Sequence, residues 1–261
     1  VVLHVAAPTV GISTSAWTDA IEAQAKPGVG YTLYYASAVK WTQAGDSSHW
    51  EFDSDTIAET EVYGVTLYLD GSSVFASEIE SGMSAEVWYT GGVQETYPAK
   101  FSQVVAVSLS REDDARYDLC GLYLQVLEDL WNEDDGLNGG AEVVSVDLSK
   151  APGGLTAGEK AAIAYVFAQR HGVEGLTMTF DELREDGYLT GEKLEGGSTA
   201  YSFTNGLLFT ITPEETQDNG ASVCFSAGKW RSPLGAYSFT NCAASRGESG
   251  WEYSVGAEMI A

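Results

Sequence analysis

Alternation of apolar and polar residues dominates the chain up to about residue 108, and this is the pattern of strands with one buried face. The clearest segments are Tyr31–Tyr35, Val62–Leu69, Val74–Ile79 and Ala85–Tyr89. Asp70-Gly71 predicts a turn between the second and third segments, and Gly91-Gly92 predicts a tight hairpin into Val93–Tyr97. We therefore expect residues 1–108 to form a β-rich domain.

After residue 108 the pattern becomes helical. Apolar side chains recur at three- and four-residue spacing, at Cys120, Tyr123, Leu124, Leu127, Leu130 and Trp131. Ser110 is the expected N-cap, because acidic residues follow it in the first turn. The acid-rich segment Asn132–Gly140 ends this helix.

Two shorter helices follow, each with a signal at both ends. A capping box starts each helix and a glycine ends it: Thr156 and Glu159 with Gly172 for the first, Thr179 and Glu182 with Gly187 for the second.

Strands occupy the rest of the chain. The candidates are Val143–Leu148, Tyr201–Thr212 folded at Asn205-Gly206, Val223–Arg231, Ala236–Ala243 and Trp251–Val255. The expected fold class is α+β. A β-rich, N-terminal domain (residues 1–108) precedes an α+β domain (residues 109–261) whose helices pack on an antiparallel sheet.

The chain is strongly acidic, with 38 Asp and Glu against 13 Lys and Arg and a formal net charge of -25. Such a protein is repelled by polyphosphate and by anionic lipid, so we expect no nucleic acid as a partner. No stretch approaches the about 20 apolar residues that span a bilayer, so we expect no membrane insertion. The expected partner is a neutral or cationic ligand, or another protein.

Residues 82–99, GMSAEVWYTGGVQETYPA, resemble the final hairpin of small OB-like β-barrel domains of unknown function in secreted proteins of Gram-positive bacteria. The part from Leu119 onward resembles an uncharacterised exported bacterial family, through segments such as Asp129-Leu130-Trp131 and Lys229-Trp230-Arg231-Ser232. These resemblances imply an OB-like barrel in the N-terminal half and an extracellular or cell-envelope location. A start at Val1 without Met fits removal of an export signal. The resemblances imply no activity.

The densest acidic cluster follows the first helix. Calcium prefers carboxylate and carbonyl oxygens, and the glycine-rich segment after the cluster is able to bend around an ion. The candidate ligands are Asp129, Glu133, Asp134, Asp135 and Asn138. The alternative is a solvated helix end, where acidic side chains oppose the helix dipole.

Trp88 and Glu86 share one face of the predicted strand Ala85–Tyr89. An exposed Trp beside a carboxylate can stack on a sugar ring or bind a cation, so these two are the candidate ligand-binding residues. Packing of Trp88 inside the protein is the alternative, and it is the commoner fate of a large aromatic side chain.

Cys224 and Cys242 fall on two strands that we expect to form a hairpin. A register centred on Pro233 places the two cysteines directly opposite each other, within the distance that a disulfide requires. A disulfide fits an exported protein, and two free, packed thiols are the alternative. Cys120 stays unpaired on its helix.

Lys229 and Arg231 share one face of a predicted strand. Their charges could hold a carboxylate or the acidic N-terminal domain, but we expect them to protect a sheet edge from pairing. His171 is expected to cap a helix end. The sequence contains no GxSxG, HExxH or P-loop, so we assign no catalytic residue.

These observations favour a non-enzymatic binding or interaction protein without a cofactor. Two other functions stay open. One is a hydrolase acting on a neutral polymer such as a glycan, which needs only two carboxylates. The other is an adhesive module stabilised by calcium.

Overall fold

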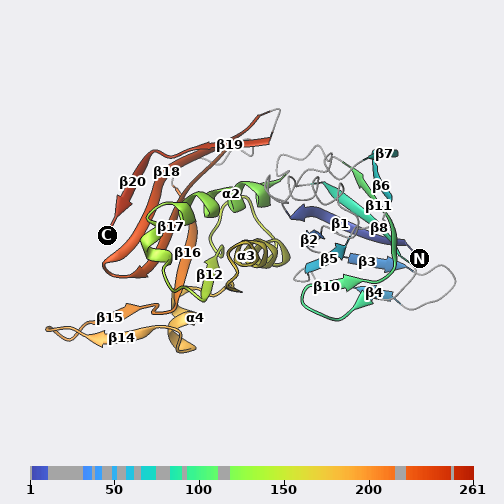
Figure 1. Cartoon of the computed structure of the whole chain (residues 1–261). Coiled ribbons are helices and arrows are strands. Elements are labelled where there is room, and N and C mark those ends of the chain that lie inside the picture. The colour runs from blue at the N-terminus through green and yellow to red at the C-terminus, as the bar shows by residue number, and fades with distance from the viewer. Residues whose placement is uncertain are drawn as a thin grey trace. The chain divides into compact units, whose positions relative to one another are not determined.

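The computed structural model describes residues 2–10, 32–36, 39–42, 49–51, 57–61, 66–74, 83–89, 93–110, 118–214, 222–247 and 250–261. The fold is mixed α+β and rich in strands (Figure 1). The chain divides into two compact units. The first contains Val1–Gly121 and Thr156–Ala162, and the second contains Leu122–Leu155 and Ile163–Ala261.

The first unit is built on one curled sheet. Its strands are β1 (Val2–Val10), β2 (Thr32–Ala36), β3 (Val39–Thr42), β4 (His49–Glu51), β5 (Ile57–Glu61), β6 (Thr66–Leu69), β7 (Ser72–Val74), β8 (Ser84–Tyr89), β9 (Val93–Gln94), β10 (Ala99–Phe101) and β11 (Val104–Ser110). Their order is β7-β6-β11-β8-β1-β2-β5-β10-β9, and β3 pairs with both β1 and β4. Val87 of β8 and Val107 of β11 are fully buried in its core.

One of the two predicted N-terminal hairpins is confirmed. β6 and β7 pair with Leu69 opposite Ser72, and the two turn residues, Asp70 and Gly71, have φ of 49° and 82°. Two positive φ values are what a two-residue hairpin turn requires. The hairpin across Gly91-Gly92 is wrong, because β8 uses its two edges to pair with β1 and β11, and β9 pairs with β10.

The second unit combines a second sheet with helices. The helices are α2 (Leu119–Asn132), the 3₁₀-helix η2 (Asp135–Asn138), α3 (Ala157–His171) and α4 (Phe180–Glu185). Of these, α2 and α3 have their first residues, up to Gly121 and Ala162, in the first unit. The strands are β12 (Val143–Asp147), β13 (Glu174–Leu176), β14 (Thr190–Lys193), β15 (Thr199–Ser202), β16 (Gly206–Pro213), β17 (Ser222–Ser232), β18 (Gly235–Gly247), β19 (Gly250–Ser254) and β20 (Ala257–Ile260). The sheet order is β13-β12-β16-β17-β18-β19, β20 pairs with β18, and β14 and β15 form a separate pair.

The first helix begins later than predicted. Ser110 is the last residue of β11, and α2 starts at Leu119. The side chain of Asp118 accepts a hydrogen bond from the backbone N–H of Gly121 at 3.1 Å. A Cβ at Gly121 would lie 2.4 Å from that carboxylate, so the glycine makes room for the cap.

Both predicted capping boxes are confirmed. Thr156 and Glu159 exchange side-chain to backbone hydrogen bonds at the start of α3, and Thr179 and Glu182 do the same at the start of α4. None of the described helices is long and apolar enough to cross a membrane.

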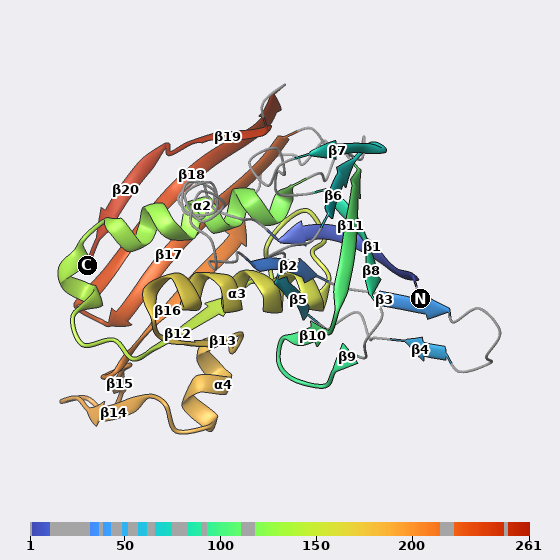
Figure 2. The ribbon, with the colours of Figure 1, turned by 45° about the vertical axis from the view of Figure 1, so that its right-hand side comes forward.

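α2 and α3 cover one face of the second sheet (Figures 1 and 2). Phe167 of α3 meets Phe209 of β16 edge to face at 4.9 Å, and Tyr123 of α2 meets Phe225 of β17 at 5.9 Å. The buried row of β17 is Val223, Phe225, Ala227 and Lys229, so a lysine lies in line with the core.

A smaller core lies around α4. It contains Val143, Leu183, Leu189, Phe203 and Leu208. The predicted fold of Tyr201–Thr212 into a hairpin at Asn205-Gly206 is wrong, because β15 pairs with β14 while β16 pairs with β12 and β17. The strand predicted over Val143–Leu148 is confirmed as β12.

Candidate functional site

The acidic segment after α2 closes around a cation, and this cation is the side chain of Lys229. We call the segment Glu133–Asn138 the acidic loop. The Lys229 ammonium donates to the backbone carbonyls of Trp131 (3.4 Å), Glu133 and Asp134 (3.2 Å) and to Oδ1 of Asn138 (3.1 Å). The sequence predicted that oxygen atoms of this segment surround a calcium ion. The oxygen atoms do surround a positive charge, but the charge belongs to a lysine of β17.

Lys229 is fully buried, and burial lowers the pKa of its ammonium from the ordinary 10.5. The charges of Asp134, Asp135 and Glu133 act in the opposite direction. The last carbonyls of a helix have no partner within the helix, and a positive charge there is favourable. Lys229 therefore satisfies the end of α2 and offsets the acidic side chains that oppose the helix dipole.

Arg231, two residues along β17, holds the other end of the acidic loop. Its guanidinium donates to the carbonyl oxygens of Leu137 and Gly139, each at 2.7 Å, and to that of Thr204 at 2.6 Å. β17 lies between β16 and β18, so the expected role of Lys229 and Arg231 as guards of a sheet edge is wrong.

Lys229 and Arg231 bind the backbone carbonyl oxygens of the loop. The side chains of Glu133, Asp134 and Asp135, by contrast, are exposed. Within the described ranges, no three His, Cys, Asp or Glu side chains come together in a way that could hold a metal ion. The predicted ligand Asp129 lies elsewhere, because its carboxylate accepts a hydrogen bond from the hydroxyl of Tyr253 on β19.

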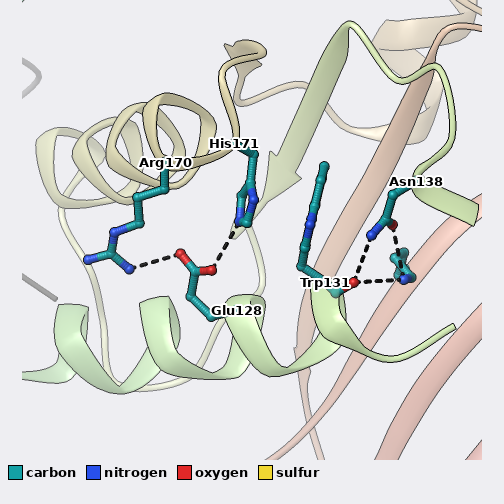
Figure 3. Close-up of polar contacts among 6 residues, drawn as sticks. Glu128, Trp131, Asn138, Arg170 and His171 are labelled. Carbon is teal, nitrogen blue, oxygen red and sulfur yellow. Dashed lines mark hydrogen bonds and ion pairs between the residues drawn. The ribbon is translucent and has the colours of Figure 1, made fainter. Parts of the chain in front are cut away.

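A second polar cluster joins α2 to the end of α3. Figure 3 shows Glu128 of α2 between Arg170 and His171 of α3. Arg170 Nη1 lies 2.9 Å from Glu128 Oε1, and His171 Nε2 lies 3.0 Å from Oε2. The imidazole of His171 stacks on Trp131, with ring centroids 3.9 Å apart and planes at 18°.

Glu128 is held as an anion in this cluster. Burial acts to raise the pKa of its carboxyl, but hydrogen bonds from His171 and Arg170 outweigh burial and lower the pKa below the ordinary 4.5. Both carboxylate oxygens are engaged, and His171 is fixed by Trp131. This geometry ties two helices together, and capping of α3 by His171 stays a prediction.

The predicted disulfide is not formed, and Cys224 and Cys242 are free thiols. Ala227 pairs with Phe239 as predicted, but Phe225 pairs with Cys242, so β18 has one extra residue between these pairs. The bulge contains Asn241, with φ of 51°. Because of the shift, Cys224 faces Ala243, and the two thiols belong to opposite faces of the sheet.

Glu86 and Trp88 lie on β8, with their backbones paired to β1 and β11. Ala85 and Val87 are buried, as expected for the other face of this strand. The side chains of Glu86 and Trp88 lie outside the described part, so their role in ligand binding stays a prediction.

Exposed apolar side chains mark one edge of the second sheet, which the sequence interpretation missed. Leu234, in the turn between β17 and β18, is 90% exposed, and Met259 and Ile260 of β20 are 57% and 74% exposed. Ala236 pairs with Ala261, so the turn and the end of β20 lie at the same end of the sheet. We call β20 together with Leu234 the C-terminal edge.

Comparisons with protein-family models, with curated proteins and with solved structures found no match to this chain.

Proposed function

We propose that this protein is a non-enzymatic binding protein, extracellular or associated with the cell envelope, and that it holds a partner protein at the C-terminal edge. An OB-like barrel in the N-terminal half and membership of an exported bacterial family are parts of this proposal, and the resemblances of the sequence support them.

The observation that carries the proposal is the exposure of Leu234, Met259 and Ile260 within one edge. Exposed apolar residues that lie close together, here on the two faces of one sheet edge, are typical of surfaces that bind other proteins. Each of these side chains loses contact with water when a partner covers it, which favours association.

The use of the charged groups in the second unit supports binding over catalysis. Lys229 is enclosed by loop oxygens, Glu128 by Arg170 and His171, and Asp129 by Tyr253. A general acid or base needs a proton that it can exchange with a substrate. These groups serve the internal structure of the second unit instead.

Panning a random peptide library displayed on phage against the immobilised full chain tests the proposal. The selected peptides are then compared on two variants. The triple variant Leu234→Ser/Met259→Ser/Ile260→Ser removes the apolar side chains of the C-terminal edge, and Leu194→Ser is the matched control. Leu194 is a half-exposed leucine in the turn between β14 and β15. We expect enriched peptides that bind the wild type and Leu194→Ser equally and fail to bind the triple variant. Peptides that bind all three proteins alike, or no enrichment, would contradict the proposal.

A further inference from the structure

The outer side of β20 presents backbone groups that are able to pair with another strand. Ala236 and Ala261 exchange both of their N–H···O=C bonds, at 3.2 and 2.9 Å. In an antiparallel pair, such hydrogen-bonded positions alternate with positions whose N–H and C=O point away from the partner. The pairs Tyr237 with Ile260 and Phe239 with Glu258 are of the second kind, so Ile260 and Glu258 direct their N–H and C=O groups away from β18.

In the described part of the chain, β18 is the strand with which β20 pairs, and β20 lies on the outer side of β18 (Figures 1 and 2). All four residues of β20 are exposed. A row of free N–H and C=O groups on an exposed strand is a template for strand addition.

The two faces of this edge differ in chemistry. Glu258 and Ile260 lie opposite the buried Phe239 and Tyr237, and thus on the face that α2 and α3 cover. The hydroxyl of Tyr237 donates to Glu258 Oε2 at 2.6 Å. The carboxylate of Glu133 also interacts with the Tyr237 hydroxyl. Two carboxylates therefore stand beside the edge on this face.

Met259 lies on the opposite face. Its cross-strand partner is Ser238, and its neighbours on the same face are Ala257 of β20 and Ala261, the residue after β20. Small residues on both sides leave the Met259 side chain, which is 57% exposed, open to an apolar neighbour.

We propose that β20 binds an extended segment of a partner protein as an added strand, with basic side chains on the face of Glu258 and Glu133 and apolar side chains on the face of Met259. This inference rests on the proposed function and names the chemistry of the partner. Charge complementarity selects the basic residues, and main-chain hydrogen bonds to Ile260 and Glu258 supply affinity.

The same charges disfavour a second copy of this chain as the added strand. β20 contains one carboxylate and no basic residue, and each copy carries a net charge of -25. Two copies of the edge would place like charges side by side, which is destabilising.

Short synthetic peptides test the inference by fluorescence anisotropy at low and high salt. The probe alternates Lys and Val, one control alternates Glu and Val, and a second control is the Lys–Val peptide with an N-methyl group on every backbone amide, so that neither edge of the peptide can donate. The full chain should bind the Lys–Val peptide, more weakly as salt screens the charges. Each control peptide should bind at least about tenfold more weakly, since one carries the opposite charge and the other lacks the backbone donors.

Ile260→Pro and Ile260→Ala form the matched pair of variants. Both remove the isoleucine side chain, but the proline also removes the outward N–H while leaving the ladder to β18 intact. We expect Ile260→Pro to bind the Lys–Val peptide at least about tenfold more weakly than Ile260→Ala. The N-methylated peptide gives the same information on the wild type, so the test does not depend on folding of the proline variant.

Equal binding of the methylated and unmethylated peptides would overturn strand addition, and so would dimerisation of the chain through β20 in sedimentation. Either result leaves the proposed function standing if panning still yields peptides that require the C-terminal edge. Absence of such peptides would contradict the proposed function itself.

Discussion

The ammonium of Lys229 lies 3.1 Å from the side-chain oxygen of Asn138, at the centre of a group of oxygens that also includes backbone carbonyls at the end of α2. A residue of the central strand β17 and a residue of the acidic loop, 91 positions apart, thus complete one site. The amide of Asn138 links both parts, because its nitrogen donates to the carbonyl of Trp131 at 2.8 Å.

Replacing Lys229 with Met should lower the free energy of unfolding by roughly 2–4 kcal/mol, because several partly buried acceptors lose their donor. Urea unfolding of wild type and variant measures the change. Lys193→Met, at an exposed position of β14, is the control and should change stability little. Equal stability of Lys229→Met and Lys193→Met would contradict the role given to Lys229.

Calcium should leave the melting temperature of the wild type unchanged, because Lys229 takes the position that an ion would need. The measurement is thermal unfolding with added calcium and then with a chelator in excess. A ligand that binds only the folded state raises the melting temperature. A clear rise with calcium would therefore restore the calcium-stabilised module as a function.

Stability should depend on Glu128 in acid. The pKa of this carboxyl is lower in the folded state than its ordinary 4.5, so its contribution is fully present above that pH. The contribution is lost as the pH falls through the folded-state value. The free energy of unfolding of Glu128→Gln should therefore fall less between neutral and acidic pH than that of the wild type. The midpoints of urea unfolding at the two pH values measure this difference. A variant with the acid sensitivity of the wild type would show that Glu128 does not provide it.

The thiols should differ in reactivity. Burial raises the pKa of Cys242 to about 11, and its side chain is 1% exposed, whereas Cys224 is half-buried. Because the thiolate is the reactive form, a thiol reagent at mildly alkaline pH should modify Cys224 first and Cys242 only after unfolding. Cys224→Ser should abolish the fast reaction. Unfolding without reductant should release all three thiols, and a count of one would demonstrate the Cys224–Cys242 disulfide.

Local signals in the sequence predicted local structure well. The capping boxes at Thr156 and Thr179 and the turn at Asp70-Gly71 depend on residues a few positions apart, and all three are confirmed. Strand pairing depends on residues that are distant in the sequence. The hairpins at Gly91-Gly92 and Asn205-Gly206 fail for this reason, since neighbouring strands there find other partners.

The candidate site was predicted in part. The acidic loop and Lys229 were each recognised, but the sequence alone does not show that they meet. Lys229 follows Val223, Phe225 and Ala227 in a strictly alternating row, which is the signal that could have placed it on the buried face. The disulfide prediction failed on one bulge at Asn241, because a shift of one residue moves a side chain to the other face.

The contacts that hold the acidic loop fix the course of its backbone and do not depend on its exposed side chains. Lys229 and Arg231 grip backbone carbonyl oxygens, which every amino acid possesses, so the identity of Glu133, Asp134 or Asp135 matters little to these contacts. The outer side chains of the loop can therefore be exchanged while its course stays the same. The charge on the surface of the loop can therefore change by substitution without a change in its backbone. A related chain with other residues at these positions could prefer a different partner.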